Sequence, residues 1–100
     1  MSRAGVKKDL LEQLRVQGKT GQYFEDLIND YCSLWDVKTK LIKDIKARGV
    51  MYEDYSSVGV KVMKNNPSTK ELVMVNRQML AILKDLGLNS AEVAEDDEEL

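Results

Sequence analysis

The sequence predicts a mainly α-helical protein that forms a ring-type homo-oligomer. Apolar residues recur at helical spacing between Tyr23 and Ala47, they do so again after the pair Asn66-Pro67, and the residues between the two stretches have strand character. The expected fold is a short N-terminal helix, a long antiparallel helical hairpin with a small β-like connector, and a disordered acidic C-terminal tail. Oligomerisation is expected because the apolar stripes of two such helices are hard to cover in one copy.

The first two helices are predicted from their apolar spacing. Residues Val6, Leu10, Leu11 and Leu14 indicate a short helix, which the glycines at 18 and 21 end. The long helix that follows has a wide apolar stripe, expected in the core or at a subunit interface: Phe24, Ile28, Tyr31, Trp35, Ile42 and Ile45. Arg48-Gly49 is typical of a helix end, with a cation in the last turn and glycine just beyond it.

The connector and the third helix complete the hairpin. Residues 50–55 and then Val58, Val60 and Val62 predict a small β-hairpin, or an irregular loop with strand character. Pro67 suits the first turn of a helix, and Asn66 suits its cap. A heptad pattern follows, which we expect to pack on the long helix: Leu72, Val75, Met79, Ile82 and Leu86. Three segments result, namely a basic helix and turn (1–21), a helical-hairpin oligomerisation core (22–88) and an acidic flexible tail (89–100).

Charge is unevenly distributed along the chain. The net charge is −2, but residues 91–100 contain six acids and no base, so the 11 acids and 15 bases of residues 1–90 give that part a net charge of +4. A basic body with an acidic tail is associated with nucleic-acid partners. Two clusters are candidate DNA-binding residues: Arg3, Lys7, Lys8, Arg15 and Lys19, and then Lys38, Lys40, Lys43, Lys46 and Arg48. A solvated helix face explains them about equally well.

No residue pattern indicates catalysis. The sequence has no histidine and one cysteine, and it contains neither a glycine-rich phosphate loop nor a G-x-S-x-G motif. Cys32 is expected to be a small core residue. We therefore expect no enzymatic activity, no metal site and no cofactor. The lone cysteine, the short apolar runs and the lack of an apolar signal segment near Met1 favour an intracellular protein without a membrane span.

Three stretches, in this order, resemble the small terminase subunits of tailed phages, specifically the P27-type family. They are residues 27–35 (LINDYCSLW) leading to Arg48-Gly49, residues 64–67 (KNNP) and residues 79–88 (MLAILKDLGL). The resemblance implies a non-catalytic component of the genome-packaging motor in the cytoplasm of the bacterial host. Such subunits form rings, recognise double-stranded viral DNA and modulate the large terminase subunit, which has the ATPase and nuclease. Family members often have a basic end after Leu-Gly-Leu, where this chain has acids.

The acidic tail is a candidate partner-binding segment. It comprises Glu92, Glu95, Asp96, Asp97, Glu98 and Glu99, with Leu100 as an apolar anchor. Its expected docking surface is either the basic body of the same ring or the large terminase subunit, and a purely solubilising role is the alternative. Two other functions stay open. One is a small helix-turn-helix-like transcriptional regulator that uses the first two helices, and the other is a phage structural adaptor that does not bind DNA.

Overall fold

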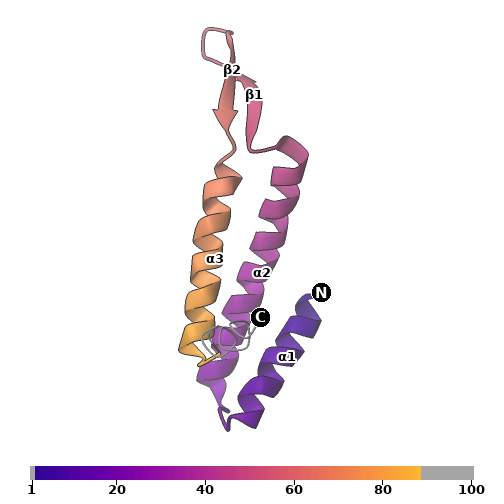
Figure 1. The fold of residues 1–100 in the computed structure, drawn as a ribbon, viewed down its shortest axis with the longest axis vertical. Coiled ribbons are helices and arrows are strands. Elements are labelled where there is room, and N and C mark those ends of the chain that lie inside the picture. Colours follow the sequence, from indigo (N-terminus) through magenta and orange to yellow (C-terminus); the bar gives the residue numbers. More distant parts are fainter. Residues whose placement is uncertain (1, 89–100) are drawn as a thin grey trace, which may run out of the picture.

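The computed structural model describes residues 2–88, which form three helices and one antiparallel pair of strands (Figure 1). In chain order these elements are α1 (Arg3–Val16), α2 (Gln22–Arg48), β1 (Met51–Tyr55), β2 (Lys61–Asn65) and α3 (Pro67–Asp85). The predicted mainly helical fold with a small β-structure is confirmed. The acidic tail lies outside the described residues. No helix among residues 2–88 has the length and apolar content that a membrane span requires.

Helix α1 has a well-defined start and end. The hydroxyl oxygen of Ser2 accepts a hydrogen bond from the Gly5 N–H at 3.0 Å, which satisfies one of the N–H groups that a helix leaves unpaired at its start. The helix stops before Gly18, whose φ of +72° lies in the left-handed region that glycine adopts without steric cost. The chain then reverses, and α1 packs along the N-terminal half of α2 (Figure 1).

A β-hairpin connects α2 to α3 at the end of the molecule remote from α1 (Figure 1). Its strands pair from Met51 opposite Asn65 to Tyr55 opposite Lys61. Strand β2 begins at Lys61, later than the alternation of Val58, Val60 and Val62 suggested. The reason is the turn at residues 56–60, where the Ser56 N–H donates to the Val60 carbonyl at 2.8 Å and Gly59 has a φ of +82°.

A polar network joins the end of α2 to the start of α3. Asn66 is fully buried, its Oδ1 accepts a hydrogen bond from the Ser68 N–H at 3.0 Å, and its Nδ2 donates to the Gly49 carbonyl at 2.9 Å. The Asp44 carboxylate accepts hydrogen bonds from the Ser68 hydroxyl at 2.7 Å and from the Arg48 guanidinium at 2.8 Å. The predicted end of α2 at Arg48-Gly49 and the predicted start of α3 at Asn66-Pro67 are confirmed. The network joins these two helix ends.

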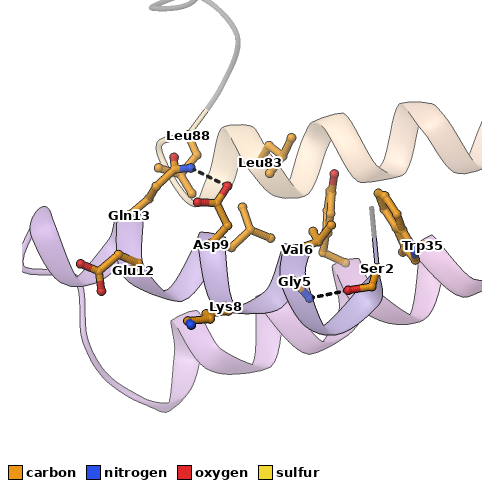
Figure 2. Close-up of a pocket in the computed structure, with 12 residues that line it drawn as sticks. Ser2, Gly5, Val6, Lys8, Asp9, Glu12, Gln13, Trp35, Leu83 and Leu88 are labelled. Atoms are coloured by element: carbon orange, nitrogen blue, oxygen red, sulfur yellow. Dashed lines mark hydrogen bonds between the residues drawn. The ribbon is translucent and has the colours of Figure 1, made fainter.

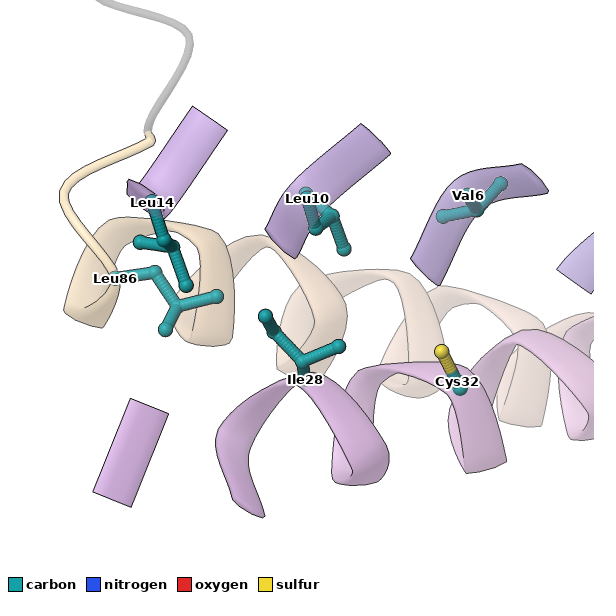
Figure 3. Packing of buried hydrophobic residues seen from close by; sticks show 6 residues of the cluster. All are labelled: Val6, Leu10, Leu14, Ile28, Cys32 and Leu86. Carbon is teal, nitrogen blue, oxygen red and sulfur yellow. The ribbon is translucent and has the colours of Figure 1, made fainter. Parts of the chain in front are cut away.

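The core lies where the three helices meet (Figure 3). Side chains from each helix region form one buried cluster: Val6, Leu10, Leu14, Ile28, Cys32 and Leu86. The predicted aromatic residues Phe24, Tyr31 and Trp35 pack against this cluster and are half-buried. Cys32 has no exposed surface, which confirms the prediction of a core cysteine.

The rest of the hairpin is thinly covered. Leu41 and Met79 are buried, whereas five predicted core or interface positions are only half-buried: Ile42, Ile45, Leu72, Val75 and Ile82. The structure extends over 61 × 36 × 21 Å, and its radius of gyration of 18.2 Å exceeds the roughly 13 Å of a compact domain of 100 residues. An elongated single copy therefore leaves much apolar surface in contact with water.

Candidate nucleic-acid interface

The outer face of α1 is predominantly basic. A shallow depression on this face is lined by Arg3, Ala4, Lys7, Lys8, Leu11, Glu12 and Arg15. The Arg15 guanidinium donates two hydrogen bonds to the Glu12 carboxylate, at 3.0 and 2.6 Å. These bonds lower the pKa of Glu12 and raise the pKa of Arg15, so both groups are charged at neutral pH. Because Glu12 offsets the charge of Arg15, Lys7 and Lys8 contribute most to the positive charge of this face.

The second predicted cluster lies on α2 beyond the part that α1 covers. Lys40, Lys43 and Lys46 are exposed, whereas Lys38 is half-buried. The side of α2 that faces α3 is marked by Leu41, which is buried, and by Asp44. At about 100° per residue, Lys43 and Lys46 project from the opposite side and Lys40 from the flank. None of these three exposed lysines is in an ion pair among residues 2–88.

An ion pair brings the two clusters together. The Arg3 Nε lies 3.0 Å from the Asp36 Oδ2. Arg3 is one helical turn before Lys7 on α1, and Asp36 is one turn before Lys40 on α2. The two clusters, which are separate in the sequence, therefore adjoin at this ion pair and extend from it in opposite directions along the antiparallel helices α1 and α2. We call the lysines on both sides of this ion pair the basic band: Lys7, Lys8, Lys40, Lys43 and Lys46.

Besides Arg3 and Arg15, two more of the predicted DNA-binding cations are engaged within the fold. The Lys19 Nζ donates to the Leu86 carbonyl at 2.9 Å, where a cation pairs well with the unsatisfied carbonyls of a helix end. Arg48 binds Asp44 through two nitrogens, donates to the Asn66 Oδ1 at 3.1 Å, and lies 4.7 Å from the centre of the Tyr52 ring. Hydrogen bonds from Arg48 and then Ser68 hold the pKa of Asp44 well below its usual range.

The first turns of α2 are acidic. Their exposed positions include Glu25, Asp26 and Asp30. In a helix-turn-helix protein, the N-terminal residues of the second helix contact base edges in the major groove. Three carboxylates at this position would face the negative phosphates of DNA. The surface of α2 therefore disfavours the transcriptional-regulator alternative.

A larger groove lies between α1, α2 and the end of α3 (Figure 2). Its volume is about 780 Å³, and apolar residues from all three elements form much of its lining: Val6, Leu10, Tyr31, Trp35, Leu83 and Leu88. Burial raises the pKa of Tyr31, so its hydroxyl is protonated at physiological pH. This apolar lining does not suit the polyanionic backbone of DNA, and the groove is separate from the basic band except at Lys8, which contributes to both.

Comparison with known protein families matches residues 8–95 to the family described as phage terminase, small subunit. The match covers nearly the whole chain, including α2, the β-hairpin and α3. The chain belongs to the phage terminase small subunits. Its role is that of the small subunit of a phage terminase, and the resemblance noted in the sequence is confirmed. Comparisons with curated proteins and with solved structures gave no match.

This terminase small subunit has a third set of cations that sequence reasoning missed. Lys70, Arg77 and Lys84 are exposed on α3 and recur every seven residues. Two helical turns bring such positions back to nearly the same side of the helix. The spacing is a readable signal, but it is easily overlooked because apolar residues separate these cations, unlike the clustered lysines of α2.

Proposed function

We propose that this chain is the DNA-recognition and regulatory subunit of the genome-packaging motor of a tailed phage. The observation that carries the proposal is the family match over residues 8–95. The basic band supports it, since its lysines are exposed except for the half-buried Lys7. In this role the chain is non-catalytic, assembles as a ring, binds double-stranded viral DNA and modulates the ATPase and nuclease of the large terminase subunit. It acts in the cytoplasm of the bacterial host.

The basic band is the proposed DNA contact. Its lysines are not in ion pairs with other residues of the range 2–88, so phosphates do not have to compete with internal carboxylates for them. Each neutralised phosphate contributes about −0.9 to the slope of log K against log salt concentration. In a ring every subunit repeats the band, and weak contacts add through avidity.

Removing two charges from the band tests this contact. We expect the double variant Lys40→Gln, Lys43→Gln to bind duplex DNA more weakly and to lose up to about 2 from the magnitude of the salt slope. The matched control is Lys61→Gln, Lys64→Gln, which removes the same charge from the β-hairpin, where each lysine already pairs with an acid. An equal effect of both variants, or no effect of either, contradicts the proposal.

The part of the band on α1 needs its own variant. Lys7→Gln, Lys8→Gln removes two charges from the outer face of α1, and the comparison with the α2 variant shows which helix makes more phosphate contacts. If DNA lies across the Arg3–Asp36 junction, both variants reduce the salt slope. If neither variant changes DNA retention, the structural-adaptor alternative is favoured.

Assembly is proposed from the thin coverage of the hairpin. Domains of this size bury only a little over about 60% of their unfolded surface, and this elongated one leaves large apolar side chains exposed on both hairpin helices: Tyr23, Val37, Val73, Met74 and Leu80. Head-to-tail contacts between identical copies close into rings with cyclic symmetry. A monodisperse monomer at micromolar concentration would contradict this part of the proposal.

Contact with the large terminase subunit is proposed through the acidic tail. Deleting residues 91–100 separates the roles open to it. Lost stimulation of the ATPase with unchanged DNA binding supports docking on the large subunit. Tighter DNA binding with unchanged stimulation supports masking of the basic band by the tail. No change in either property contradicts both and leaves a solubilising role.

A further inference from the structure

The outer side of α3 has a regular pattern of cations and apolar residues. Val73, Met74 and Leu80 are 57%, 57% and 59% exposed, which is unusual for large apolar side chains on a helix. Arg77 lies between them on the same side, and Lys70 and Lys84 extend the row in both directions. This side is opposite the heptad that faces α2. Among residues 2–88 no element covers it, and none of its cations is in an ion pair.

A face of α2 has the complementary character. Asp26, Asp30, Ser33 and Val37 follow one another at spacings of four, three and four residues, so they lie on one side of the helix, and all four are exposed. A shallow depression adjoins this side, lined by Asp30, Ser33, Leu34, Gln78 and Ile82. The depression lies between α2 and α3 of the same chain, and the same side of α2 continues to Leu41 and Asp44, which face α3. The face therefore borders the groove of the hairpin, and it combines carboxylates, an exposed valine and a hollow lined in part by Leu34 and Ile82.

The two faces match in level along the hairpin axis. Asp44 of α2 binds Ser68 of α3, and ten residues further along the antiparallel pair Leu34 and Gln78 line the same depression. By this count Asp30 is level with Ile82, about half a turn from Lys84. Ser33 is likewise level with Met79, next to Leu80, and Val37 is level with Val75, next to Met74. Lys84, Leu80 and Met74 of one face therefore each have a counterpart at nearly the same height on the other.

We propose that the outer side of α3 in one copy packs against this acidic face of α2 in the next copy. The inference rests on the ring of the proposed function and names its subunit contact. Lys84 pairs with Asp30 of the neighbour, Leu80 enters the depression beside Ser33, and Met74 contacts Val37. Rotation about an axis parallel to the helices keeps every residue at its level, so a cyclic assembly satisfies all of these contacts at once.

Charge complementarity favours a second copy over DNA as the occupant of the α3 face. A DNA-binding face needs cations without large apolar side chains between them, because phosphates gain nothing from contact with valine, methionine or leucine. An interface between proteins instead combines an apolar centre with opposite charges that set the register. The row on α3 has this composition, and the basic band does not.

Two charge reversals test the contact. Asp30→Lys and Lys84→Glu each place like charges opposite one another in every subunit contact, and we expect each to weaken assembly at least about tenfold. Lys46→Glu is the matched control, since it makes the same kind of change on an exposed side of α2 outside the contact. Assembly is measured by native mass spectrometry and by sedimentation velocity, and circular dichroism checks that each variant is folded.

Mixing the two single variants in equal amounts is the decisive step. Within each single variant residues 30 and 84 have the same charge, so no contact inside one chain can restore the pair. Between the two variants, every contact joins a lysine to an acid. We expect the mixture to reassemble into multimers with alternating copies, in which closed rings contain an even number of subunits.

Each outcome has a distinct meaning. Failure of the mixture to reassemble, or normal assembly of both single variants while the parent forms rings, overturns the proposed contact and leaves the ring intact. A monomeric parent overturns the ring itself, and with it the assembly part of the proposed function. Normal assembly of Lys84→Glu with lost DNA binding would assign the α3 face to DNA and overturn the proposal.

Discussion

Replacing Asn66 with alanine is expected to destabilise the junction between α2, the β-hairpin and α3 strongly. The Asn66 side chain is fully buried and makes three hydrogen bonds, with the Ser68 N–H, the Gly49 carbonyl and Arg48. Loss of the helix cap costs about 1 kcal/mol. The Gly49 carbonyl, left without its partner in a partly buried position, costs about 1–3 kcal/mol more. The expected loss in the free energy of unfolding is therefore about 2–4 kcal/mol.

Urea denaturation followed by circular dichroism measures this loss. Parent and variant are compared at one protein concentration, because subunit association adds to apparent stability. The midpoint should move to lower urea at an unchanged slope. Asn65→Ala is the matched control, since the Asn65 side chain is exposed and donates or accepts no hydrogen bond within residues 2–88. We expect the control to lie within about 0.5 kcal/mol of the parent. Equal stability of the two variants would refute the assigned role of Asn66.

Three further predictions concern the charged junction and the core. The pKa of Asp44 is lowered in the folded state, so the stability that its carboxylate gives the folded protein is fully present above the unfolded pKa of about 3.9 and is lost as the pH falls toward the lower folded pKa. Asp44→Asn should therefore flatten the fall in the free energy of unfolding between roughly pH 4 and 2. A pH dependence equal to that of the parent contradicts this. Leu14→Ala, at a side chain 2% exposed, should cost about 2–5 kcal/mol in a urea titration, whereas Leu11→Ala, at 39% exposed, should cost much less; similar losses would exclude the assigned packing of α1. Cys32 has no exposed surface, so a thiol reagent should label it only on unfolding, and rapid labelling of the native protein would show that the core opens.

Local features of the fold could be predicted from the sequence. Asn66-Pro67 defines the start of α3 because a cap and a first-turn proline act within a few residues of each other. The end of α2 at Arg48-Gly49 is equally local. The second strand was displaced from its predicted position, because the turn at residues 56–60 and the pairing of Met51 with Asn65 set the register. Alternating valines alone do not contain that information.

The candidate site was less predictable because it depends on contacts between distant residues. The sequence identified both lysine clusters, but nothing local shows that Arg3 pairs with Asp36 and joins them. The hydrogen bond from Lys19 to the Leu86 carbonyl spans 67 residues and has no signature in the sequence. Arg48 is different, since Asp44 lies four residues before it and the spacing of a helical ion pair could have shown that its charge is engaged.

Native mass spectrometry of the full chain, with and without duplex DNA, tests ring assembly and DNA binding together, because it reports the copy number and the DNA binding of the same particle. We expect one closed multimer at micromolar concentration that takes up duplex DNA without changing its copy number and releases it as salt is raised. A monomer that remains free in the presence of duplex DNA at low salt would contradict both the ring and the DNA contact.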